Sequence, residues 1–142
     1  MTSMKTRQFN DVSLGDRLPK MEVPITSTLI TAGAIATRDY FPGHLDKDAA
    51  QELGSPHVFM NILTTSALVQ RFVEDWAGPT ARFNDLKIKL GAPNYPGDTM
   101  VLNGEISDVS PEKNAVEVTL KGKNSMGNHV TGTVSVVLPK ND

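Results

Sequence analysis

The feature that most constrains the fold is a change of hydrophobic period about halfway along the chain. Residues 59–76 (FMNILTTSALVQRFVEDW) fit one long helix, and its first half is apolar on most sides. A helix of that kind is buried rather than laid on a surface. From residue 81 onward, apolar residues alternate with polar ones, which is the pattern of strands that bury one face. The second half of the chain therefore predicts a sheet packed on a buried helix.

Four segments after residue 80 carry this alternation, and short turn-like connections between them favour antiparallel pairing. An earlier stretch, residues 18–25, is read as a further strand that Pro24 confines to an edge or an end. The predicted fold class is therefore α+β, with an antiparallel sheet wrapped around a long central helix. The four later strands are expected at residues 81–92, 100–106, 116–120 and 130–138.

Two shorter helices are expected between the first strand and the central helix. Residues 29–39 follow a run of cap candidates, and residues 47–53 are capped by Asp46 and closed by Gly54. We expect one domain over residues 1–142, with residues 1–10 as a flexible tail. A single layer of this kind leaves a sheet edge exposed, so a dimer is predicted.

The composition excludes several classes of protein. The 14 Lys and Arg residues against 16 Asp and Glu give a net charge of −2, without the basic face of a nucleic-acid-binding protein. Cysteine is absent, so disulfides and thiolate chemistry are excluded. No apolar stretch approaches a membrane span, and the first residues do not resemble a signal peptide. The sequence predicts a cytoplasmic protein with no membrane or nucleic-acid partner.

Among the three histidines, His44 carries the strongest catalytic signal. It follows Asp39 by five residues in DYFPGH, where Pro42-Gly43 forces a turn. A carboxylate and an imidazole in one cleft can hold one water and exchange a proton with it. A surface turn with a helix-end ion pair is the alternative interpretation. His57 is expected to be a packed residue at a helix start, and His129 a solvated turn residue.

A metal site is a weaker interpretation of the same region. His44 with Asp39, Asp46 and Asp48 offers nitrogen and oxygen ligands, but there is no H-E-x-x-H motif, second nearby histidine or cysteine. No phosphate-binding glycine loop and no G-x-S-x-G nucleophile motif occurs either. We therefore expect no metal and no separate cofactor.

Four motifs together resemble the MaoC-like hot-dog hydratases, the (R)-specific 2-enoyl-CoA hydratase group. D-x-F-P-x-H at residues 39–44 is similar to the family's D-x-N-P-x-H. SPHVFMN leads into a long helix, LKIKLGAPNYPGDTM fills residues 86–100, and VSVVLP closes the last strand. The resemblance covers roughly residues 9–138.

This resemblance implies a hot-dog fold, usually dimeric, and an acyl thioester of coenzyme A as substrate. Asp39 and His44 match the catalytic pair that adds water across a trans-2-enoyl thioester, giving a 3-hydroxyacyl-CoA. A backbone N–H at Phe59 or Met60 is expected to bind the thioester oxygen. Residues Phe41 and Asn61 are expected to contact the substrate.

Two residues depart from the family pattern, since Arg38 replaces a glycine and Phe41 replaces an asparagine. Arg38-Asp39 followed by an aromatic residue, together with MNILTTSALVQRFVEDWAGP, resembles the small single-hot-dog subunits of actinobacterial steroid side-chain degradation. That resemblance implies a bulky, steroid-like acyl-CoA and either a homodimer or a heteromer with a second hot-dog subunit. The alternatives are a non-catalytic acyl-CoA-binding subunit and a hot-dog thioesterase, for which the acidic residues Glu74 and Asp75 are poorly placed.

Overall fold

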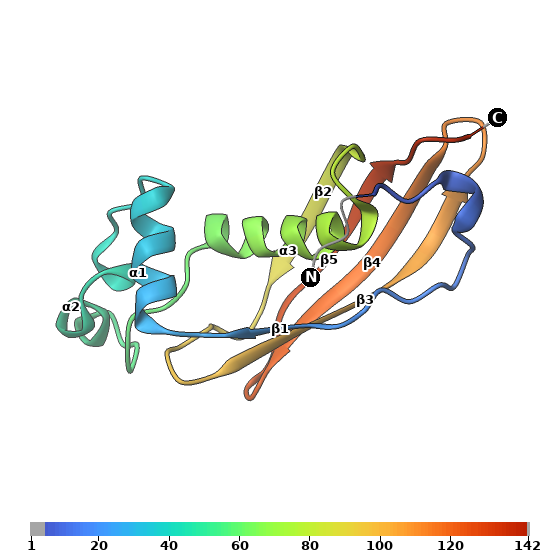
Figure 1. The fold of residues 1–142 in the computed structure, drawn as a ribbon. Coiled ribbons are helices and arrows are strands. Elements are labelled where there is room, and N and C mark those ends of the chain that lie inside the picture. The colour runs from blue at the N-terminus through green and yellow to red at the C-terminus, as the bar shows by residue number, and fades with distance from the viewer. Residues whose placement is uncertain (1–4, 142) are drawn as a thin grey trace.

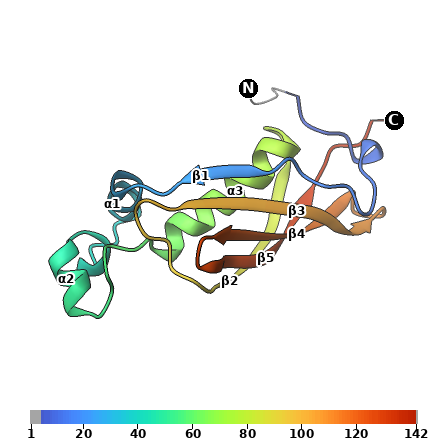
Figure 2. The same ribbon diagram turned by 90° about the horizontal axis from the view of Figure 1, so that it is seen from below.

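The computed structural model describes residues 5–141, and its strands form one five-stranded antiparallel sheet in the order β1-β3-β4-β5-β2. Helix α3 lies across one face of this sheet, while α1 and α2 lie beyond one end of it (Figures 1 and 2). The predicted sheet around a central helix is therefore confirmed. The helices are η1 (Phe9–Asp11), α1 (Ser27–Ala36), η2 (Pro42–His44), α2 (Lys47–Glu52) and α3 (Ile62–Ala77); the strands are β1 (Met21–Pro24), β2 (Arg82–Leu90), β3 (Thr99–Ser110), β4 (Ala115–Asn124) and β5 (Gly127–Val137).

The core lies between α3 and the sheet. The buried residues of α3 include Leu68, Val69, Phe72, Val73 and Trp76, which recur at the three- and four-residue spacing of one helix face. Fully burying a large apolar side chain contributes about 1.5–3 kcal/mol. Within residues 5–141, no helix combines the length and the apolar character needed to cross a membrane. The strand residues of the core include Met100, Leu102, Ile106, Val116, Val118, Leu120, Val130, Val134 and Val136.

The first turn of α3 differs from the prediction. The helix begins at Ile62 rather than at residue 59, because the side chain of Asn61 caps it by accepting a hydrogen bond from the N–H of Thr64. Ile62, Leu63 and Ala67 are exposed, so the expectation that the first half is buried on most sides is wrong at these three positions. The reason is visible in Figure 1, where this end of α3 extends beyond the sheet toward α1.

Residues 5–10 do not form the expected flexible tail. The N–H of Arg7 donates to the carbonyl of Ala77, and its guanidinium donates to the carbonyl of Trp76 at 2.6 Å. The Phe9 side chain is buried in the core. This segment therefore ties the carboxyl end of α3 to the rest of the fold, while residues 1–4 lie outside the described part of the chain.

Helix α1 packs closely on α3 at Gly33, which has no side chain. A Cβ added at Gly33 would collide with the side chain of Thr64, whose hydroxyl is buried without a hydrogen-bond partner among the described residues. The prediction that small residues on this helix allow close packing is confirmed. Asp39 lies three residues after the end of α1, so this contact helps to hold Asp39 near the start of α3.

We expect Gly33→Ala to lower the free energy of unfolding by about 1–3 kcal/mol, the usual penalty for overpacking a close contact. Urea denaturation measures this change. The matched variant Thr64→Ala removes an unpaired hydroxyl and should alter stability by less than about 1 kcal/mol. If the collision is the cause, the double variant should recover most of the loss; a Gly33→Ala protein as stable as the wild type would contradict this account.

Candidate active site

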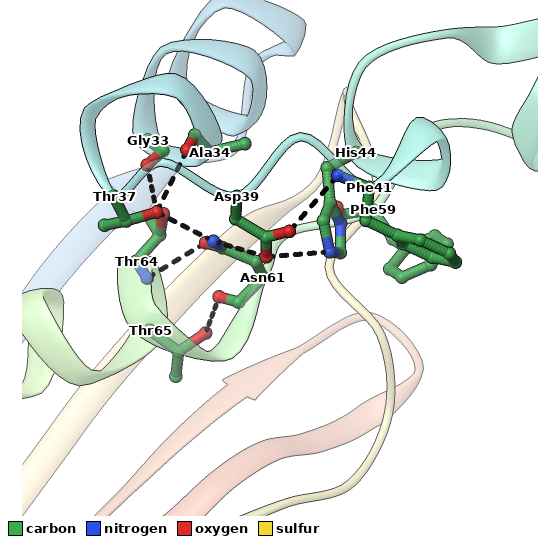
Figure 3. Close-up of polar contacts among 10 residues, drawn as sticks. All are labelled: Gly33, Ala34, Thr37, Asp39, Phe41, His44, Phe59, Asn61, Thr64 and Thr65. Carbon is green, nitrogen blue, oxygen red and sulfur yellow. Dashed lines mark hydrogen bonds and ion pairs between the residues drawn. The ribbon is translucent and has the colours of Figure 1, made fainter.

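Asp39 and His44 come together at the junction of α1 and η2. Their side-chain tips approach to 3.4 Å between Asp39 Oδ2 and His44 Nε2, as the spacing in DYFPGH predicts (Figure 3). The turn between them begins at Arg38, whose φ of 56° lies in the left-handed region. That conformation is unfavourable for a side chain other than glycine by about 1–2 kcal/mol. Arg38 therefore bears a strain that the glycine expected at this position from the resemblance would avoid.

Both carboxylate oxygens of Asp39 accept hydrogen bonds. Oδ2 accepts from Nδ2 of Asn61 at 3.0 Å, and Oδ1 accepts from the backbone N–H of Phe41 at 3.2 Å. The Asn61 hydrogen bond is the largest cause that holds the pKa of Asp39 below its ordinary range; the Phe41 N–H and the charge of His44 add to it, and partial burial opposes it. Asp39 is therefore an anion at neutral pH.

His44 is buried at 7% exposure and held in a defined orientation. Its Nδ1 lies 2.6 Å from the carbonyl oxygen of Phe59, and a carbonyl only accepts, so Nδ1 carries the hydrogen. In the neutral ring, Nε2 then presents its lone pair toward Asp39. The rings of Phe41 and Phe59 meet the imidazole edge-on, with centroids at 5.3 and 4.8 Å. Two fixed acceptors thus face one spot, where a water can be held and deprotonated.

The expected oxyanion donors are engaged elsewhere. The N–H of Phe59 donates to the carbonyl of Gly43, and the N–H of Met60 donates to the carbonyl of Asn94, each at 3.2 Å. The expectation of a free N–H at these two residues is therefore not met in this structure. At the start of α3, the N–H groups of Ile62 and Leu63 have no hydrogen-bond acceptor within residues 5–141, and both residues are exposed. Both lie at the positive end of the helix dipole.

The two residues expected to contact substrate differ in their surroundings. Asn61 is 2% exposed, and its amide is bonded to Asp39, Thr37 and the N–H of Thr64, so the structure gives it a role within the protein. Phe41 is 46% exposed beside His44. Substrate contact at Phe41 stays a prediction.

The surroundings of the pair are apolar and open. Among the described residues, no group of three or more His, Cys, Asp or Glu side chains is arranged to hold a metal ion. A hollow of about 570 Å³ lies elsewhere, along β3, β4 and β5, and neither Asp39 nor His44 lines it. The exposed large apolar residues on α1, on the segment that carries the pair and on the first turn of α3 are Ile35, Tyr40, Phe41, Ile62 and Leu63.

His129 contacts the first turns of α3, and the prediction that it is a solvated turn residue is wrong. It is 2% exposed in β5 rather than solvated in a turn. Its Nδ1 lies 2.7 Å from the carbonyl of Ala92, and its Nε2 lies 2.8 Å from the hydroxyl of Thr65 on α3. Since the Ala92 carbonyl only accepts, the neutral ring donates through Nδ1 and accepts from Thr65. The ring therefore fastens α3 to the segment that follows β2. His57, by contrast, is half-buried just before α3, as expected.

We expect the stability of the protein to fall in acid partly through His129. Burial lowers the pKa of this imidazole, against a smaller opposing effect of the Ala92 hydrogen bond. Between this lowered pKa and a pH of about 6.5, the ordinary histidine value, the unfolded chain therefore binds more protons than the folded one. The stabilisation that the folded state gains from a neutral His129 is complete above that pH and is lost as the pH falls through the lowered pKa.

The variant His129→Gln tests this account by urea denaturation at several pH values. The free energy of unfolding should be about 1–3 kcal/mol lower at neutral pH, because a glutamine amide can replace only one of the two ring nitrogens and leaves either the Ala92 carbonyl or the Thr65 hydroxyl without its partner. The difference between wild type and variant should shrink as the pH falls from 7 to 5. A difference that stays constant over this range would show that His129 does not titrate as described.

Comparisons with known proteins agree with this fold. Residues 12–128 match the family described as MaoC like domain. The chain is 41% identical over 123 residues to the 3-oxo-4,17-pregnadiene-20-carboxyl-CoA hydratase beta subunit of Mycobacterium tuberculosis, covering 87% of this chain and 94% of that protein. It is also similar to a chain in the crystal structure of the ChsH1-ChsH2 complex from the same organism, with a TM-score of 0.86 and 40% identity over 89% of this chain and 98% of that one.

A more distant structure shows the fold alone. The R-hydratase PhaJ1 of Pseudomonas aeruginosa superposes with a TM-score of 0.87 at 19% identity, covering 96% of this chain and 88% of that one. The hot-dog fold expected from the motifs is thereby confirmed.

Proposed function

The chain belongs to the MaoC-like domain family, and we propose that it is an enoyl-CoA hydratase, a hydro-lyase acting on a trans-2-enoyl-CoA thioester. The observation that carries the proposal is the 3.4 Å approach of Asp39 Oδ2 and His44 Nε2, with His44 Nδ1 fixed on the Phe59 carbonyl and the pKa of Asp39 lowered so that it is an anion. In the reaction, the water oxygen bonds to C3 of the enoyl group. One water proton passes to the Asp39–His44 pair, and the pair returns a proton to C2, so the product is a 3-hydroxyacyl-CoA.

The thioester oxygen becomes more negative as the water adds, and it needs a hydrogen-bond donor. We place that donor at the first turn of α3, where the N–H groups of Ile62 and Leu63 have no acceptor within residues 5–141. This replaces the donors expected at Phe59 and Met60. A preorganised donor of this kind is worth about 10²–10³-fold in turnover.

The variant Ile62→Pro tests that placement, because proline at the first helical position removes the N–H and is otherwise well tolerated. Asn61 has φ −81° and ψ 160°, which suits a residue before proline. We expect kcat to fall by about 10²-fold with little change in the melting temperature. The matched control Ile62→Ala keeps the N–H and should keep kcat within a few-fold of wild type. Equal activity of the two variants would exclude the Ile62 N–H and leave that of Leu63 as the donor.

The mycobacterial relatives support a proposal for the substrate and for the partner. One of them is named as a hydratase of a pregnadiene carboxyl-CoA, and another similar chain is part of a two-component complex. We propose a bulky, steroid-like enoyl-CoA substrate and a second hot-dog chain as partner. Two features support a neighbouring chain: the exposed apolar residues near the pair, and the outer edge of β2, which pairs with no strand among the described residues. A coenzyme A substrate fits the expected cytoplasmic location.

The experiment that tests the function compares the chain alone with the complex purified from its own host. Each sample is incubated with a short-chain enoyl-CoA and with a steroid enoyl-CoA, and loss of the conjugated enoyl absorbance reports hydration. We expect hydration, and a rate unaffected by prior treatment with a chelator, since the reaction is proposed to need no metal or cofactor. Release of free thiol would indicate a thioesterase instead, and no turnover in either sample would indicate a non-catalytic subunit.

A further inference from the structure

Asn61 links the amino end of α3 to the carboxylate of the proposed site. Its Oδ1 accepts from the N–H of Thr64 at 3.0 Å, which caps the helix. Its Nδ2 donates at 3.0 Å to Asp39 Oδ2 and at 3.0 Å to the hydroxyl oxygen of Thr37 (Figure 3). One buried amide therefore serves a helix cap and the reactive carboxylate together.

The orientation of this amide follows from its partners. A backbone N–H can only donate, so the atom that faces Thr64 must be the amide oxygen. The Thr37 hydroxyl hydrogen points to the carbonyls of Gly33 and Ala34, at 2.8 and 3.1 Å, so Thr37 offers Asn61 a lone pair. The NH₂ group must then face Asp39, and an NH₂ group is satisfied there only by an acceptor. The helix cap thus dictates that Asp39 meets a donor.

We propose that Asn61 is a positioning residue for the proposed hydration, which holds Asp39 ionised and aimed at the water through an amide locked by the α3 cap. The inference rests on the proposed function and adds to it the residue that sets the state of the carboxylate. Asn61 does not touch the substrate in this account, which separates it from the earlier expectation of a substrate contact. The asparagine of the family motif cannot supply this amide, because position 41 carries a phenyl ring here and contributes only its backbone N–H to Asp39.

The electrostatics around Asp39 agree with this role. The Asn61 hydrogen bond is the foremost cause of the lowered pKa of Asp39, ahead of the charge of His44. The groups that face the carboxylate are Asn61 from α3, the Phe41 N–H and the His44 ring, while the neighbouring Arg38 side chain is exposed. Removing the Asn61 amide should therefore raise the pKa of Asp39 more than removing any other single side chain.

The test compares Asn61→Ser with Asn61→Ala. Serine caps a helix as well as asparagine does, but its hydroxyl stops one bond short of Asp39, whereas alanine loses both functions. We expect kcat to fall by about 10–10²-fold in both variants, since a small misplacement of a reacting group can cost about 10²-fold, with KM nearly unchanged. Only the alanine variant should also have a lower melting temperature.

Carbon NMR of the Asp39 carboxyl in labelled protein supplies a measurement that does not depend on activity. Its pKa should rise in Asn61→Ser, and the acidic limb of the kcat/KM profile should move to higher pH with it. Asn61→Asp should raise it further, because two carboxylates then share one site while the cap remains. The swapped double variant, D39N with N61D, should restore a single normal carboxyl titration but not the turnover.

Two results would overturn the proposal: an Asp39 pKa in Asn61→Ser equal to that of wild type, or a rise in KM with kcat unchanged, which would make Asn61 a substrate contact. Failure of the proposed function is a separate outcome. If the wild-type complex hydrates no enoyl-CoA, the hydratase assignment falls, and the NMR titration still decides whether Asn61 holds Asp39 ionised.

Discussion

Asp39→Asn is expected to lower the hydration rate by about 10²–10⁴-fold, the contribution typical of a positioned acid–base group. The substitution keeps the shape of the side chain and removes its charge. The new amide oxygen can still accept from Nδ2 of Asn61, which donates to Asp39 at 3.0 Å in the wild type. The loss therefore measures the chemistry of the carboxylate rather than packing around it. Turnover of an enoyl-CoA by the complex gives the rate, and circular dichroism confirms folding.

The matched control for this prediction is Asp46→Asn. Asp46 lies two residues after His44 and caps α2 by accepting from the N–H of Asp48 at 3.0 Å. Asparagine caps a helix about as well as aspartate, so this variant should retain both its stability and its rate. A folded Asp39→Asn protein that works as fast as Asp46→Asn would reduce the Asp39–His44 contact to an ion pair at the end of a helix.

The regular part of the fold could be predicted because burial imposes a period on the sequence. The alternation in residues 116–120 and 130–138 corresponds to β4 and β5, and the caps at Thr26 and Asp46 start the two helices expected there. The start of α3 was misplaced because the apolar run begins before the helix does. Asn61 was the available signal, since asparagine before an apolar run is a preferred cap.

His129 could not be placed by the same pattern. In β5 it precedes Val130, and the alternation that puts Val130 inside would put His129 outside. The pairing of β4 with β5 shifts register between Gly122 and Lys123, where Lys123 faces Asn128 and Gly122 faces Val130. His129 is the extra residue of this bulge and turns inward beside Val130. A bulge re-aims one side chain without leaving a mark in the hydrophobic pattern.

In the site, too, the local part could be predicted from the sequence and the contacts between distant residues could not. The motif DYFPGH placed Asp39 and His44 together because the turn is local, and the structure brings their tips to 3.4 Å. The partners of that pair come from elsewhere in the chain: Asn61 is 22 residues from Asp39, and the Phe59 carbonyl is 15 residues from His44. The hydrogen bonds that leave Phe59 and Met60 without a free N–H also depend on tertiary contacts. Spacing alone carries no information on such contacts.

His44→Gln should also reduce hydration by about 10²–10⁴-fold, and the double variant with Asp39→Asn should be little slower than the slower single variant. The two groups hold one water and pass one proton, so removing either disables the same step. Glutamine is chosen over alanine because the imidazole is packed between Phe41 and Phe59, and its amide can still donate to the Phe59 carbonyl. The measurement is a double-mutant cycle of kcat/KM with the same enoyl-CoA.

His57→Gln is the matched control for this cycle, because His57 is half-buried before α3 and, among residues 5–141, its Nδ1 accepts only from the adjacent N–H of Val58. The hydration rate of the His57→Gln variant should stay close to that of wild type. Multiplicative losses in the Asp39–His44 double variant would mean that the two residues act on different steps. In that case His44 would serve a proton transfer separate from the activation of water by Asp39, and the 3.4 Å contact would not be the catalytic unit.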